Sequence, residues 1–169
     1  MNKLILFCVE TTKKANTDYL YISETIKRFY GENNKIVRRP VYMQSRTRYK
    51  DRATTSQIEK FRKSFPNDNI TVIYCIDVDD YDTSPTTKKL LDEIKRYCNE
   101  NHYEFIFFCR DVEDVYWGKR ANKNEKVQKA ASFKETKRIS TIEESQLRKS
   151  KYAKNSSNIL NVLDQCWTR

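Results

Sequence analysis

Four apolar segments of the chain have the character of β-strands, and each is bounded by polar residues. They are segments 3–9, 35–43, 69–76 and 103–109. The first lacks alternation between apolar and polar residues, which is typical of a central strand that is covered on both faces. The second contains Pro40, so we expect it to lie at an edge of the sheet or to contain a bulge.

The segments between these strands have the apolar spacing of helices. Thr17 and Asp18 are suited to cap the first helix, and Ser84 followed by Pro85 is suited to start the third. The expected helices cover residues 19–29, 56–65 and 88–101. The alternation of strands and helices predicts an α/β fold in which a parallel, four-stranded, Rossmann-like sheet carries helices on both faces.

The chain changes character after Trp117. It becomes rich in lysine and serine, its apolar periodicity weakens, and helices are expected only near 142–147 and 159–167. A length of 169 residues suits one domain. We therefore expect an α/β core over residues 1–117 and a basic, partly helical extension over residues 118–169 that packs on it.

Composition excludes several classes of protein. With only 2 glycines and 3 prolines, a turn-rich β fold is not expected. No apolar run approaches the roughly 20 residues of a membrane span, and the first run is too short for a signal peptide, so we expect a cytoplasmic protein without a membrane partner. The five cysteines include no C-x-x-C pair, which favours reduced, buried thiols. The single histidine, His102, lies in a polar stretch, so a histidine-based site is not expected.

The net charge of +10 is distributed unevenly. Residues 35–52 carry seven basic and one acidic side chains, and residues 118–154 carry twelve and four, whereas residues 53–117 carry eight and thirteen. Basic surface attracts the phosphate backbone of nucleic acids, and Tyr49 could add stacking on a base. The alternative is an ordinary solvated face. The candidate nucleic-acid contacts are Arg46, Arg48, Lys50, Arg52, Lys119 and Arg120.

Acidic residues follow three of the four expected strands. Glu10 follows the first strand, Asp77 and Asp79 follow the third, and Glu113 and Asp114 follow the fourth. The carboxyl ends of parallel strands meet at one edge of a sheet, so these side chains could share a crevice. Clustered carboxylates repel one another, and protonation or a hard divalent cation offsets the repulsion. Helix caps and solvent-exposed carboxylates are the alternative interpretation.

This combination resembles the TOPRIM domain of topoisomerases, primases and OLD-type nucleases, in which a Glu follows the first strand and a D-x-D motif follows a later one. The chain is most similar to the small RloB-like proteins associated with phage defence, whose first motif is a strand, a Glu and a helix containing Tyr or Phe. The resemblance covers residues 3–117. It departs at Thr11, where the family often has Gly, and at residues 112–117, which match the aromatic-Glu motif before Trp loosely.

The resemblance implies a nuclease that depends on Mg²⁺ or Mn²⁺ and acts on DNA or RNA, with a protein partner in a defence complex as a further expectation. Asp77 and Asp79 would bind the ion, Glu10 would act as general acid or base or complete the metal site, and Glu113 is a further candidate ligand. The alternative is a non-catalytic nucleic-acid-binding or defence-complex subunit. A nucleotide-binding module is disfavoured because no glycine-rich phosphate loop occurs. The sequence leaves open DNA against RNA, substrate sequence, oligomeric state, catalytic competence and the biological trigger.

Overall fold

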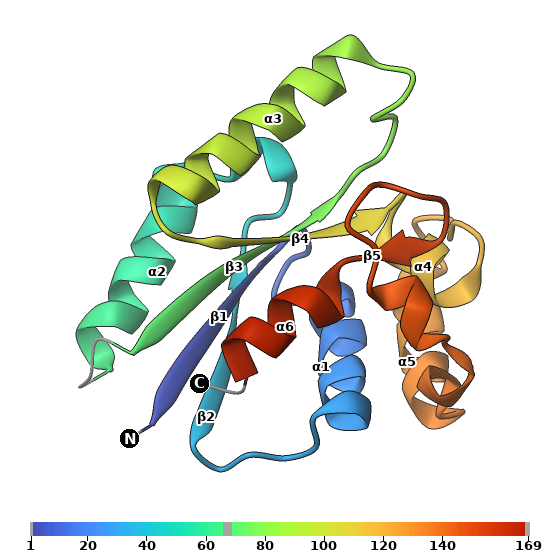
Figure 1. The fold of residues 1–169 in the computed structure, drawn as a ribbon, viewed down its shortest axis with the longest axis horizontal. Coiled ribbons are helices and arrows are strands. Elements are labelled where there is room, and N and C mark those ends of the chain that lie inside the picture. Colours follow the sequence, from blue (N-terminus) through green and yellow to red (C-terminus); the bar gives the residue numbers. More distant parts are fainter. Residues whose placement is uncertain (1, 66–68, 168–169) are drawn as a thin grey trace.

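The computed structural model describes residues 2–65 and 69–167 and has an α/β architecture built on one five-stranded sheet (Figure 1). The strand order is β2-β1-β3-β4-β5, and β5 is antiparallel to β4 whereas the other neighbours are parallel. The strands are β1 (Lys3–Val9), β2 (Ile36–Tyr42), β3 (Ile70–Asp77), β4 (Glu104–Cys109) and β5 (Ser156–Ser157). The expected four parallel strands are confirmed. The short fifth strand was not predicted, because two serines carry no apolar pattern.

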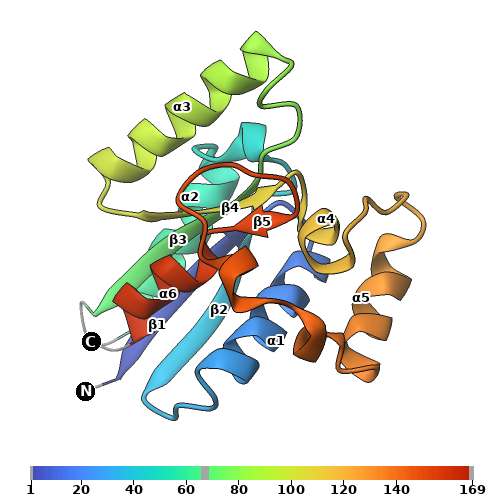
Figure 2. The ribbon, with the colours of Figure 1, turned by 45° about the vertical axis from the view of Figure 1, so that its right-hand side comes forward.

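Helices cover both faces of the sheet, as the alternation of elements predicted (Figures 1 and 2). Helices α2 and α3 pack on one face, and α1, α5 and α6 pack on the other. The helices are α1 (Thr17–Phe29), α2 (Arg52–Ser64), α3 (Pro85–Glu100), α4 (Val112–Trp117), α5 (Lys126–Glu135) and α6 (Ile159–Trp167), with short 3₁₀ turns η1 (Arg46–Arg48), η2 (Arg138–Thr141) and η3 (Glu144–Leu147).

The position of each strand explains its residue pattern. Every residue of β1 is buried, because β1 lies between β2 and β3 and has a helical layer on each side. Its side chains alternate between the two layers, so that Phe7 enters one apolar cluster and Leu6 enters the other. Strand β2 is the edge strand that Pro40 indicated, and it pairs with β1 in continuous register without a bulge.

Several local predictions need correction. Asn16, in left-handed backbone with φ of 47°, precedes α1, so Thr17 and Asp18 lie inside the helix rather than capping it. Helix α2 begins four residues earlier than expected, at Arg52, and α5 was not predicted. In contrast, Ser84 caps α3 as expected, because its hydroxyl accepts a hydrogen bond from the backbone N–H of Thr87.

The extension that follows α4 contributes to the same apolar layer as α1. The Phe133 ring lies 4.9 Å from the Tyr21 ring and 5.3 Å from the Tyr116 ring, measured between centroids. The Ser157 hydroxyl donates to the backbone carbonyl of Phe107, and the Asn158 side chain bonds both Phe105 and Phe107 of β4. The extension therefore covers one sheet face and closes the β4 edge.

Two further observations concern the composition. Cys8, Cys75 and Cys109, which the pattern placed in strands, are buried and free. Across residues 2–65 and 69–167, no helix is long and apolar enough to cross a membrane.

Candidate functional site

The strand order creates a topological switch point between β1 and β3. The chain winds from β1 outward to β2 on one side, and then returns past β1 to add β3 and β4 on the other side. In open α/β sheets, ligands bind in the crevice beyond the carboxyl ends of the strands at such a point. Glu10 directly follows β1 and Asp77 is the last residue of β3, so both lie at this position.

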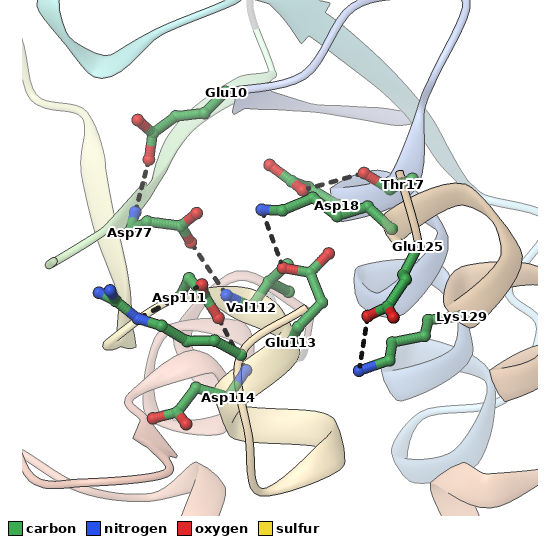
Figure 3. A network of polar contacts seen from close by, with 12 residues as sticks. Glu10, Thr17, Asp18, Asp77, Asp111, Val112, Glu113, Asp114, Glu125 and Lys129 are labelled. Atoms are coloured by element: carbon green, nitrogen blue, oxygen red, sulfur yellow. Dashed lines mark hydrogen bonds and ion pairs between the residues drawn. The ribbon is translucent and has the colours of Figure 1, made fainter. Parts of the chain in front are cut away.

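The Glu10 carboxylate is held by two backbone N–H groups. Oε1 accepts a hydrogen bond from Arg46 N at 2.9 Å. Oε2 accepts one from Asp77 N at 2.6 Å, which is drawn in Figure 3. Burial raises the pKa of Glu10 to about 7 even though both hydrogen bonds and the Arg46 guanidinium oppose the shift. Glu10 is thus a positioned carboxyl group that can exchange a proton near neutral pH.

Asp77 connects β3 to the start of α4. Its Oδ1 accepts a hydrogen bond from Val112 N at 3.1 Å. Burial raises the pKa of Asp77 well above its usual value, and the negative charges of Glu10 and Asp18 raise it further. Figure 3 shows carboxylates from four parts of the chain: Asp18, Asp77 and Glu113 lie around a common space, and the Glu10 carboxylate lies beside them against the backbone N–H of Asp77.

Asp79 is paired with Arg120, a residue that the sequence predicted to contact nucleic acid. The Arg120 guanidinium forms an ion pair with Asp79, and its Nε lies 3.9 Å from Asp111 Oδ2. Burial raises the pKa of Asp79, and Arg120 partly opposes the shift. Arg120 is therefore paired with the acidic residues, although its side chain is still 47% exposed.

Asp18 and Lys126 belong to the site but were missed as site residues. Asp18 is only 5% exposed, and burial raises its pKa to about 7, with Glu10 and then Glu113 adding to the shift. Lys126 Nζ lies 3.1 Å from Oε2 of the fully buried Glu113. A signal for Asp18 existed, because the first turn of a helix that follows a parallel strand lies near the carboxyl edge of the sheet. Lys126 carried no such signal.

The two acids on either side of Glu113 help to start α4. Asp111 is the N-cap residue, and its Oδ1 accepts a hydrogen bond from Asp114 N at 2.8 Å. Asp114 Oδ2 in turn accepts one from Arg110 N at 3.1 Å. Asp114 is thus a helix-capping partner, as the alternative interpretation of the sequence held, whereas the second oxygen of Asp111 faces Arg120. We use the term acidic cluster for Glu10, Asp18, Asp77, Asp79, Asp111 and Glu113.

The donor chemistry of the acidic cluster suits Mg²⁺ or Mn²⁺. Both ions prefer oxygen ligands, and Mg²⁺ commonly uses one or two carboxylates together with water and phosphate oxygens. However, the structure contains no preformed ligand set: among the described residues, no group of three or more His, Cys, Asp or Glu side chains is arranged to hold a metal ion. In this conformation Arg120 and Lys126 pair with Asp79 and Glu113.

The other residues predicted to contact nucleic acid have diverse environments. The Arg46 guanidinium donates to the backbone carbonyl of Asp77 at 2.6 Å, so Arg46 lies at the acidic cluster. Arg48 forms an ion pair with Asp51 at 3.0 Å. Lys50, Arg52 and Lys119 are exposed.

The proposed stacking role of Tyr49 is wrong. The residue is 4% exposed, its ring lies 5.2 Å from the Tyr97 ring, and its backbone carbonyl accepts a hydrogen bond from the Tyr74 hydroxyl. Tyr49 is a core residue that anchors the loop after β2, and its ring is not available to a base.

Comparison with known proteins gives no relative: no family model, no curated protein and no solved structure matches the chain. The site is therefore interpreted from its own chemistry.

Proposed function

We propose that the protein catalyses Mg²⁺- or Mn²⁺-dependent phosphodiester chemistry on nucleic acid, as a nuclease of the TOPRIM type. The observation that carries this proposal is the contact between the Glu10 carboxylate and the Asp77 backbone N–H at the switch point of the sheet, where burial raises the pKa values of both carboxyl groups. Shifts of this kind are typical of functional sites. A role in phage defence rests on the sequence resemblance alone.

Each residue has a defined task in this proposal. Asp77 and Asp79 would hold the ion, which when bound supplies stabilisation for the negative charge that develops on the phosphate oxygens. Glu10 exchanges a proton at its carboxyl group, for which a pKa of about 7 is well matched to neutral pH. Its two backbone hydrogen bonds keep that carboxyl group in place. Arg46, which contacts the Asp77 carbonyl, and Arg120, which pairs with Asp79, would orient a bound phosphate.

A second candidate is a non-catalytic nucleic-acid-binding or defence-complex subunit. The ion pairs of Arg120 with Asp79 and of Lys126 with Glu113 favour it, because they neutralise two of the acids without a metal ion. On this alternative the acidic cluster and its two cations form a closed polar network with a structural role.

A metal titration of the wild type and of Asp79→Asn separates the two candidates. Asp80→Asn is the matched control, because Asp80 is exposed, adjacent, and has left-handed backbone with φ of 55° that asparagine tolerates. We expect Mg²⁺ or Mn²⁺ to bind the wild type and Asp80→Asn, and both to cleave single- or double-stranded DNA or RNA. Asp79→Asn should bind the ion weakly and cleave nothing. Metal binding without cleavage would favour the subunit, and absence of metal binding by the wild type would exclude the TOPRIM proposal.

A further inference from the structure

A pocket of about 370 Å³ opens beside the acidic cluster. Its size lies at the lower end of the range for small-ligand sites, which suits a single nucleotide unit. Three cationic and two acidic side chains line it together with one aromatic ring: Arg110, Arg120, Lys154, Asp82, Asp114 and Tyr81. The pocket shares Arg120 with the acidic cluster, so the two are directly adjacent.

The three cations come from separate parts of the chain. Arg110 follows β4, Arg120 lies in the loop after α4, and Lys154 lies in the loop before β5. Pairing of Ser156 with Cys109 in the β5–β4 ladder brings the last of these loops to the end of β4 (Figure 2). The fold therefore assembles the pocket, and no short motif encodes it.

The charged side chains of the pocket differ in whether they already have a partner. Asp82 lies 3.7 Å from Arg110, and Asp114 is engaged as a capping partner of α4. Arg120 is paired with acids of the cluster. Lys154 is exposed and has no ion pair in the part of the chain that the structure describes. Lys154 is thus the cation most available to an incoming anion.

The walls of the pocket also fit a nucleotide unit. The partly exposed Tyr81 is held by an edge contact to Tyr152, at 5.0 Å between ring centroids, so its ring has a fixed orientation. An oriented aromatic side chain beside cations is a common means of binding single-stranded nucleic acid. Of the nucleic-acid contacts predicted from the sequence, Arg120 lines this pocket, whereas Tyr81 and Lys154 were not predicted.

We propose that this pocket binds a phosphate group of a nucleic-acid strand, next to the phosphate that is held at the acidic cluster. The inference rests on the proposed function and specifies the path of the substrate. Lys154 and Arg110 contact the phosphate oxygens, and Arg120 exchanges its carboxylate partners for phosphate when a strand is bound. The strand thus leaves the acidic cluster over the loop before β5.

The test compares Lys154→Ala with Lys151→Ala. Both lysines are exposed and lie in the same loop, but Lys151 lines a different hollow, so each change removes one positive charge from an exposed position. Affinity for a short single-stranded DNA and RNA is measured by fluorescence anisotropy, with Ca²⁺ replacing Mg²⁺ to prevent cleavage. We expect Lys154→Ala to weaken binding about tenfold, Lys151→Ala to change it little, and Lys154→Arg to restore it.

Three results would contradict the inference, and they differ in what else they exclude. Strand binding by the wild type with equal affinities of Lys154→Ala and Lys151→Ala would overturn the pocket and leave the proposed function intact. Absence of strand binding by the wild type would overturn both. Binding of a nucleoside monophosphate that depends on Lys154, without strand binding that depends on it, would assign the pocket to a free nucleotide instead.

Discussion

Carboxylates occur in two contrasting settings in this protein. In the acidic cluster, burial raises the pKa values of Glu10, Asp18 and Asp77. A second setting is the C-terminal ion network, made of Tyr30, Glu144, Arg148 and Asp164, in which the pKa of Asp164 is lowered. Arg148 lies 2.7 Å from Glu144 and 2.5 Å from Asp164, and the Tyr30 hydroxyl donates to Asp164. Arg148, followed by Tyr30, lowers the pKa of Asp164.

The two settings have opposite effects on the stability of the fold. Ionised Asp164 in the C-terminal ion network favours folding, because its partners bind the charged form. Ionised Glu10, Asp18 and Asp77 oppose folding, because the folded state buries these carboxylates close to like charges. Proteins retain such unfavourable groups mainly at functional sites, where activity compensates for lost stability. The contrast therefore supports a functional role for the acidic cluster independently of any sequence resemblance.

The largest expected effect is that of Asp77→Asn. The asparagine Oδ1 can still accept the hydrogen bond from Val112 N, so the change removes charge and little else. We expect cleavage of nucleic acid to fall about a hundredfold or more, measured with Mg²⁺ under single-turnover conditions. Without metal, the Tm near neutral pH should rise by about 2–4 °C, corresponding to about 1 kcal/mol. A lower Tm would instead identify Asp77 as a structural partner.

Asp18→Asn should sharpen the comparison through its pH dependence. Because the folded pKa of Asp18 is raised from 3.8 to about 7, wild-type stability declines as pH rises between these values. The variant lacks this decline, so its stability advantage should be absent near about pH 4, grow by at most about 1.4 kcal/mol per pH unit to about 4 kcal/mol near about pH 7, and then level off. Thermal unfolding across this pH range measures it. Asp92→Asn, at an exposed position on α3, is the control and should show no such trend.

Arg148→Gln should have the smallest effect and the opposite sign. The pKa of Asp164 is lowered, so its ion pair stabilises the fold at neutral pH and this contribution is lost as pH falls through the folded pKa. Arg148 and Asp164 are 36% and 46% exposed at their side chains, so we expect a loss of only about 0.5 kcal/mol at neutral pH, decreasing with added salt. The neighbouring Lys149→Gln should be neutral. A gain in stability from Arg148→Gln would remove the contrast between the two regions.

The sequence alone determined the elements whose signal is local. The unbroken apolar run of β1 predicted a central strand, and Ser84 predicted the start of α3. Pro40 indicated either an edge position or a bulge for β2, and the edge position is the one observed. The same logic placed Glu10 and Asp77 at one edge of the sheet, because parallel strands end together. These predictions succeeded because hydrophobic periodicity and capping depend on residues that are near one another in the chain.

Only the tertiary structure decided which distant charges meet. Arg120 was assigned to a basic surface, yet the loop after α4 turns it toward Asp79, 41 residues away. Tyr49 lies in a charged stretch, yet its ring is buried against α3 because the loop after β2 packs there. Lys154 gains its position through pairing of β5 with β4. Charge and exposure depend on contacts between segments that are far apart in the chain, and the local pattern of residues does not specify these contacts.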